Sequence, residues 1–236
     1  MLKNIFYPTQ QNAYVWLSAV YLLFLLYLGK LSPITILFVY FLETIVIGLF
    51  NALKMFWSIQ FGQHKTGGYW LILFFLFHYG FFVGVQSVFA FSLFEMGANS
   101  IFKEPFHLIE NYTTIITLDE MKYALPAILF THIGKFFNDF IKNEKHKKFL
   151  PTEIMFKPYV RIFIQQFVVI LSFFFMILGK AGIIAAILLI LFRLVIDLFF
   201  EAIKENSLLL DKISKKLANE KASKEDIKKQ LIHFTE

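Results

Sequence analysis

The sequence predicts an all-α, polytopic integral membrane protein with six transmembrane helices, and three observations lead to this prediction. The composition is 58% hydrophobic, with 32 Phe among 236 residues, and this apolar share is above that of soluble domains. The mean hydropathy is +0.63. Apolar runs of about 20 residues, the length that crosses a bilayer, recur along the chain. Charged residues gather between these runs and near the C-terminal end. We therefore expect a multi-pass protein of the cell membrane, with the lipid bilayer as a partner and no nucleic acid.

The first three spans are expected at residues 12–29, 33–55 and 68–94. The first follows a single Lys and has no cleavage site of small residues at the right place, so we interpret it as a mature helix and not as a signal peptide. The second carries Glu43, a carboxyl group inside an apolar run. The third contains His78 as its one side chain that titrates near neutral pH. A histidine inside the membrane is costly and therefore indicates a function.

The last three spans are expected at residues 121–141, 159–179 and 182–201. The fourth carries His132, and the sixth carries Arg193 and Asp197, which lie four positions apart on one helical face. Glycines flank the short turn between the fifth and sixth helices, which predicts a hairpin. Residues 1–202 therefore form the expected transmembrane domain. The Lys-rich and acid-rich segment 203–236 is expected to be an amphipathic helical tail.

The basic residues of the short loops predict the orientation of the chain. Loops rich in Lys face the cytoplasm, and with six spans this rule holds only if the N-terminus is inside. The residues that decide it are Lys54, Lys65, Lys142, Lys145, Lys147, Lys148 and Lys157. The interval 95–122, in which acids outnumber bases, then lies outside, and both termini and the tail lie in the cytoplasm. Because the chain has no Cys, disulfides and Cys-ligated metal centres are excluded.

Polar side chains inside the predicted spans are expected to form one cluster. With a rise of about 1.5 Å per residue, Glu43, His78 and His132 lie near mid-membrane on three separate helices. Three further side chains lie nearer the cytoplasmic face: Arg161, Arg193 and Asp197. A charge that faces lipid costs roughly 2.5 to 3.5 kcal/mol on insertion scales, so these groups should face one another and open toward the cytoplasm.

This cluster leads to a hypothesis of a membrane-embedded, metal-dependent enzyme. Glu43, His78 and His132 could hold a divalent metal ion, Zn²⁺ being preferred, with an open position for water, or could act as acid and base. Arg161 and Arg193 would then engage a lipid or an anionic small molecule. The chain has no G-x-S-x-G, H-E-x-x-H or Walker motif.

Simpler interpretations of the same residues stay open. Arg193 and Asp197 have the spacing of a structural ion pair, Glu43 could be a protonated acid, and His78 a buried hydrogen-bonding histidine. A small-solute or proton-coupled transporter, with Glu43, His78 and Asp197 as relay groups, is the first alternative function. A membrane scaffold or assembly subunit, with the tail as its contact surface, is the second. An oligomer is compatible with each of them.

Three stretches resemble the uncharacterised DUF6498 family of multi-span prokaryotic membrane proteins. They are YFLETIVIGLFNALKM from Tyr40, FFLFHYGFFVGVQSVFAF from Phe74, and the segment from PYVRIFIQQF to LFRLVIDLFFE. The resemblance implies that the signature polar positions are Glu43, Asn51, His78, Tyr79, His132, Arg161 and Asp197. We accordingly expect Asn51 and Tyr79 to join Arg161, Arg193 and Asp197 in binding substrate. The resemblance implies no activity, and the chain departs from the family pattern by having Gln86, Gln165 and Glu201 in place of further histidines.

Overall fold

The computed structural model describes residues 6–9, 12–63, 68–95, 101–177, 182–203, 208–218 and 222–235, and its elements are all helices. They are α2 (Ala13–Tyr27), α3 (Pro33–Phe61), α4 (Trp70–Glu95), α5 (Leu108–Thr117), α6 (Met121–Gly134), the π-helix η1 (Lys135–Ile141), α7 (Lys145–Lys148), α8 (Pro151–Ile177), α9 (Gly182–Ala202), α10 (Leu208–Leu217) and α11 (Lys224–Thr235). The predicted all-α class is confirmed. The tail after residue 203 is helical as well, in the form of two short helices.

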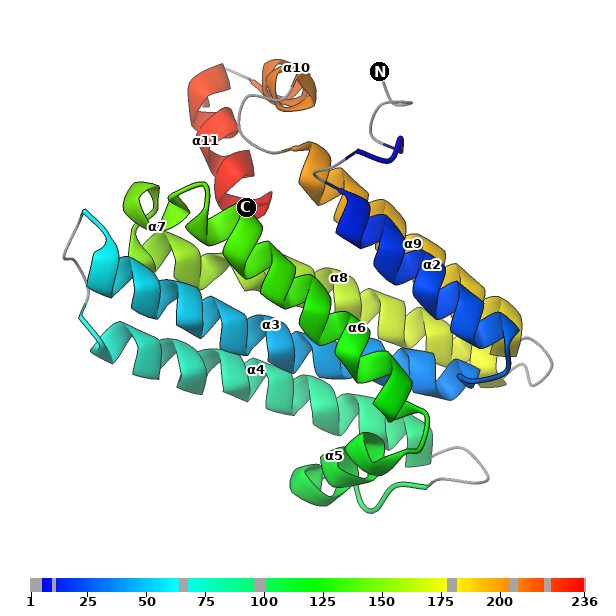
Figure 1. The fold of residues 1–236 in the computed structure, drawn as a ribbon. Coiled ribbons are helices and arrows are strands. Elements are labelled where there is room, and N and C mark those ends of the chain that lie inside the picture. The colour runs from blue at the N-terminus through cyan, green and yellow to red at the C-terminus, as the bar shows by residue number, and fades with distance from the viewer. Residues whose placement is uncertain are drawn as a thin grey trace.

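Helix α3 is the centre of the bundle and packs against α4, α6, α8 and α9 (Figure 1). Its start is well defined, because Ser32 caps it by accepting a hydrogen bond from the Thr35 N–H at 3.3 Å and Pro33 occupies its first turn. Every residue from Thr35 to Thr44 is buried. A helix that is apolar around its whole circumference has to be surrounded by other helices or by lipid, and α3 is surrounded by helices.

Two helices in the described part of the chain, α3 and α4, are long and apolar enough to cross a membrane. They differ in their surroundings, since the most apolar window of α3 is 61% buried and that of α4 only 28%. Helix α4 therefore presents large apolar side chains to the outside, among them Phe77 and Phe81. Helix α2 is a shorter apolar helix.

Helix α8 continues through an internal proline, Pro158. The helix starts at Pro151, so it extends beyond the N-terminal end of the expected span 159–179. Pro158 has no N–H, so the carbonyl of Ile154 loses its helical partner, and Asn51 Nδ2 donates to that carbonyl at 3.0 Å. Helix α3 thus satisfies the backbone carbonyl that Pro158 frees. A further hydrogen bond, from the Tyr21 hydroxyl of α2 to the Tyr123 carbonyl of α6 at 3.0 Å, joins these two helices.

Side-chain contacts also tie the helix ends together. Glu120, just before α6, accepts hydrogen bonds from the backbone N–H of Ser32 at 2.6 Å and from its hydroxyl at 2.9 Å. Partial burial raises the pKa of Glu120, but the hydrogen bonds from Ser32 and Thr35 outweigh it and hold the pKa below its ordinary value. In the tail, Asp211 of α10 pairs with Lys224 at 2.9 Å and Lys228 at 3.4 Å, and α11 packs on α8 (Figure 1).

Candidate functional site

A buried cluster of ionisable side chains lies where α3, α6 and α9 meet. His132 Nε2 lies 2.8 Å from Glu43 Oε1, and Arg193 Nη2 donates to the same carboxylate oxygen. When Glu43 is ionised its oxygen accepts both hydrogen bonds, and His132 Nε2 then carries the proton. Arg193 Nε lies 3.4 Å from Asp197 Oδ2. A single guanidinium group therefore joins two carboxylates and, through Glu43, an imidazole.

Two aromatic rings pack against the cluster. The guanidinium carbon of Arg193 lies 4.5 Å from the centroid of the Tyr40 ring, within the range of a cation–π contact. The imidazole of His132 stacks on Phe50 with 5.9 Å between ring centroids. Glu43 is only 2% exposed. Inside such apolar surroundings the attraction between opposite charges is much stronger than in water.

Helical spacing explains how the sequence places these groups. Tyr40 lies three positions before Glu43 on α3, and Asp197 four positions after Arg193 on α9, so each pair shares one face of its helix. His132 is near the end of α6, directly before η1. A π-helix is rare and is found frequently at functional sites.

A small cavity lies beside the cluster. Its lining includes Tyr40, Thr131, Arg193 and Asp197, together with Ser18 of α2. Its volume of about 10 Å³ is close to the minimum that holds one water molecule. The cavity therefore leaves a space of about the size of one water molecule next to the guanidinium group, although half of its lining residues are apolar.

Polar contacts continue from the cluster toward the end of the bundle at which α2 begins and α9 ends. The Tyr14 hydroxyl donates to Glu201 at 3.1 Å, and Lys135 Nζ lies 5.6 Å from the centroid of the Tyr14 ring. Glu201 follows Asp197 by one helical turn. Farther along, Asp139 of η1 pairs with Lys145 of α7 at 3.1 Å. The structure thus connects α2, α9 and η1 through titratable side chains.

Of the six residues expected to form the cluster, the structure brings together Glu43, His132, Arg193 and Asp197 and leaves His78 apart. The side chain of the sixth, Arg161, lies outside the described residues. The Nδ1 atom of His78 lies 2.6 Å from the Tyr159 hydroxyl, between α4 and α8. Matched depth on separate helices does not specify rotation about each helix axis, and α4 is rotated so that His78 meets α8.

The three residues expected to hold a metal ion do not converge, because His132 meets Glu43 whereas His78 meets Tyr159. In the ranges that the structure describes, no group of three His, Asp or Glu side chains is arranged to hold a metal ion. The guanidinium of Arg193 binds the same Glu43 oxygen as His132. A divalent cation at that oxygen would be repelled by the positive charge of Arg193.

The residues expected to bind substrate have other partners in the structure. Asn51 donates to the freed Ile154 carbonyl, and the Tyr79 hydroxyl donates to the Thr44 carbonyl at 2.7 Å. Both therefore join α3 to a neighbouring helix. The side chain of Arg161 lies outside the described residues, so its expected contact with an anionic substrate stays a prediction.

Sequence reasoning missed Tyr40 and Tyr159. Tyr40 could have been inferred from its position one turn before a buried acid, on the same face of the helix. Tyr159 had no such signal, because an aromatic residue in a Phe-rich helix does not by itself indicate a partner on another helix.

The fold and the site define a helical protein that contains two apolar helices of membrane-spanning length and a buried, arginine-bridged polar cluster. The chain belongs to a family of unknown function, DUF6498, whose model matches residues 1–225. The resemblance inferred from three stretches of sequence is thereby confirmed. Neither the curated proteins nor the solved structures contain a match to this chain.

Proposed function

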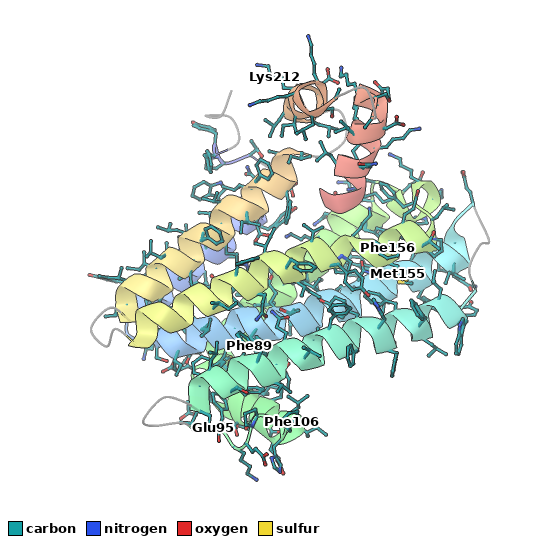
Figure 2. All side chains as sticks on the ribbon, turned by 180° about the vertical axis from the view of Figure 1, so that it is seen from behind. Phe89, Glu95, Phe106, Met155, Phe156 and Lys212 are labelled. Carbon is teal, nitrogen blue, oxygen red and sulfur yellow. The ribbon has the colours of Figure 1, made fainter. Side chains whose placement is uncertain are left out.

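We propose that the chain is a six-span membrane protein, in which α2, α6 with η1, α8 and α9 cross the bilayer alongside α3 and α4. Large apolar side chains on these helices are exposed, including Leu17 of α2, Phe130 of α6 and Phe163 of α8. Figure 2 shows Phe89 of α4 and Phe156 of α8, which are 42% and 53% exposed. Soluble proteins rarely expose apolar surface over so many elements, whereas helices that contact lipid present apolar side chains to it.

The orientation can be tested by cysteine labelling, because the chain has no Cys of its own. Glu110 of α5 and Lys147 of α7 have side chains that are 48% and 39% exposed, so a thiol at either position is accessible. With the Lys-rich loops inside, a membrane-impermeant maleimide should label Glu110→Cys in intact cells and Lys147→Cys only after permeabilisation. The Cys-free parent is the control. Labelling of both variants in intact cells would contradict the proposed topology.

We further propose that the protein is a proton-coupled carrier of small solutes. The observation that supports this proposal best is the Glu43 oxygen that is shared by His132 and Arg193. The imidazole of His132 can pass a proton to or from that carboxylate, because an imidazole nitrogen can both bind and release a proton. Arg193 is held by two carboxylates at once, so protonation of Glu43 would weaken its hold on the guanidinium and favour the pairing with Asp197. Arg193 would thus have two arrangements, one paired with both carboxylates and one paired with Asp197 alone. A switch between two such arrangements couples proton binding to a conformational change.

The other two functions are less well supported. A metal-dependent enzyme lacks the three-ligand group described above, and the Arg193 donors that would bind an anionic substrate already contact Glu43 and Asp197. A scaffold would use the tail as its contact surface, but α10 and α11 already pack on each other, and α11 on α8.

Proton flux in proteoliposomes tests the carrier proposal. With a pH-sensitive dye inside the vesicles, an imposed pH gradient and a mixture of small solutes outside, the wild-type protein should collapse the gradient faster than empty liposomes do. Glu43→Gln should lower the rate at least tenfold, because the amide keeps the size of the side chain but does not ionise. Glu110→Gln makes the same change at an exposed site and should leave the rate unchanged. A wild-type rate equal to that of empty vesicles, or an unchanged rate in Glu43→Gln, would count against the proposal.

A further inference from the structure

Helix α5 lies beside the last part of α4 and not beyond its end. A Cβ atom added at Gly84 would lie 3.9 Å from Leu108 Cδ1, and the hydroxyl oxygens of Ser87 and Tyr112 lie 2.7 Å apart. Gly84 and Ser87 precede Glu95, the last residue of α4, by eleven and eight positions. These separations correspond to about 16 Å and about 12 Å along the helix axis.

Contacts with α3 place α5 at the same level. The Tyr112 ring stacks on Phe41 with 5.8 Å between centroids, and Phe41 lies eight positions, or about 12 Å, after the first residue of α3. After α5 the chain returns to this end of the bundle, because Glu120 accepts a hydrogen bond from the backbone N–H of Ser32, directly before α3. The 10 residues of α5 span about 15 Å, which covers the distance from Gly84 to the end of α4.

This level lies inside the bilayer if α3 and α4 cross it. The 26 residues of α4 span about 39 Å, whereas the hydrocarbon is about 30 Å thick. With the hydrocarbon centred on α4, Leu108 lies about 11 Å inside its edge. Apolar side chains are exposed at the same level, because Val85, next to Gly84 on α4, is 55% exposed. Phe106, just before α5, is 75% exposed and is set back from Glu95 along α4 (Figure 2).

Helix α5 has three faces of different character. Ile109 and Ile116 lie seven positions apart on one face and are 84% and 53% exposed. Glu110 and Thr117, also seven positions apart, share the adjacent polar face. The third face packs on the bundle and includes Ile115, which is fully buried. An exposed apolar face beside a polar one is typical of helices that lie at a membrane interface.

The polar groups of α5 are satisfied within their own segment. The hydroxyls of Thr113, Thr114 and Thr117 each donate to the carbonyl four positions earlier, at 2.7, 3.0 and 2.8 Å. Hydroxyls that bond to their own helix in this way need no water. Lys103 Nζ and Glu110 Oε1 lie 3.6 Å apart, and paired charges on long side chains can reach the headgroup level from a helix that lies lower.

We propose that α5 binds lipid in the outer leaflet, with the face of Ile109 and Ile116 against acyl chains and the face of Glu110 and Thr117 at the headgroups. The contacts with α3 and α4 supply the depth, and the exposed apolar face supplies the surface that acyl chains cover. This inference rests on the six-span membrane location proposed above, but not on proton transport at Glu43.

Electron paramagnetic resonance of spin-labelled cysteine variants, reconstituted in liposomes of phosphatidylcholine and phosphatidylglycerol, tests the inference. Because the chain has no Cys of its own, Ile109→Cys, Ile116→Cys, Glu110→Cys and Thr117→Cys each carry a single nitroxide. Molecular oxygen concentrates among acyl chains, whereas a water-soluble nickel chelate is excluded from them. We expect the ratio of oxygen to nickel accessibility to be at least threefold higher at positions 109 and 116 than at 110 and 117.

Phe77→Cys provides the reference for a lipid-facing label, because Phe77 of α4 is 79% exposed. A high ratio at Phe77 with equal ratios at all four α5 positions would overturn the inference and leave the six spans standing. Low accessibility of Ile109 and Ile116 to both reagents would also overturn it, because another protein surface would then cover that face. A low ratio at Phe77 would overturn the six-span proposal and this inference together. The labels report position and not transport, so the outcome is independent of the carrier proposal.

Discussion

Replacement of Arg193 by Met is expected to destabilise the folded protein by about 3 to 5 kcal/mol, the range measured when one partner of a buried ion pair is removed. The methionine fills much of the same space but removes the cation that Glu43 and Asp197 share. Both carboxylates are at least nine-tenths buried, so their repulsion is not screened by water. The free energy of unfolding in detergent micelles, measured by denaturant titration, checks this expectation.

A double variant separates the electrostatic effect from a loss of packing. If repulsion between the carboxylates dominates, Glu43→Gln added to Arg193→Met should recover part of the lost stability, because one of the two charges is gone. Arg193→Lys keeps the positive charge, but its single nitrogen replaces the branched guanidinium group that reaches both carboxylates. We therefore expect a stability between those of the wild type and Arg193→Met. An Arg193→Met variant as stable as the wild type, or a double variant less stable than Arg193→Met, would show that the bridge is not what holds α3 to α9.

Substitution of Gly48 by Val is expected to cause the second large effect, by forcing α3 and α4 apart. A Cβ atom at Gly48 would lie 2.3 Å from Tyr79 Cε1 and 2.8 Å from Cδ1. The Tyr79 ring cannot easily move away, since its hydroxyl is bound to the Thr44 carbonyl and its side chain is buried. Overpacking of this kind costs about 1 to 3 kcal/mol for small additions and occasionally more, so Gly48→Ala should lower the thermal midpoint and Gly48→Val should lower it further.

Gly80 of α4 provides the matched control. A Cβ atom there meets nothing within 4 Å, and alanine is favoured over glycine in helices by about 1 kcal/mol. Gly80→Ala should therefore keep or raise the thermal midpoint in the same micelles. If Gly48→Ala behaved like Gly80→Ala, the close contact between Gly48 and Tyr79 would not limit the packing of α3 on α4.

The candidate site shows how far sequence reasoning reached. Spacing correctly paired Arg193 with Asp197, because residues four positions apart on one helix are neighbours whatever surrounds them. Depth counting placed Glu43, His78 and His132 at one level, and Glu43 and His132 are in contact. His78 meets Tyr159 instead, because depth leaves the rotation of α4 undetermined.

The course of α8 past Pro158 also depends on a contact from another helix. Proline usually ends a helix, but α8 continues through it because Asn51 of α3 satisfies the freed carbonyl of Ile154. No local pattern in α8 contains that information. The polar partner comes from a helix about 100 positions earlier in the chain.

By itself, the sequence determined that the chain is helical, where most helices lie, and which polar side chains each one carries, since apolar length and helical spacing are local properties. Only the tertiary structure decided which of those side chains meet. The rotation of each helix follows from the packing of all its neighbours, and that packing directed Glu43 toward His132 and Arg193 while it directed His78 toward Tyr159.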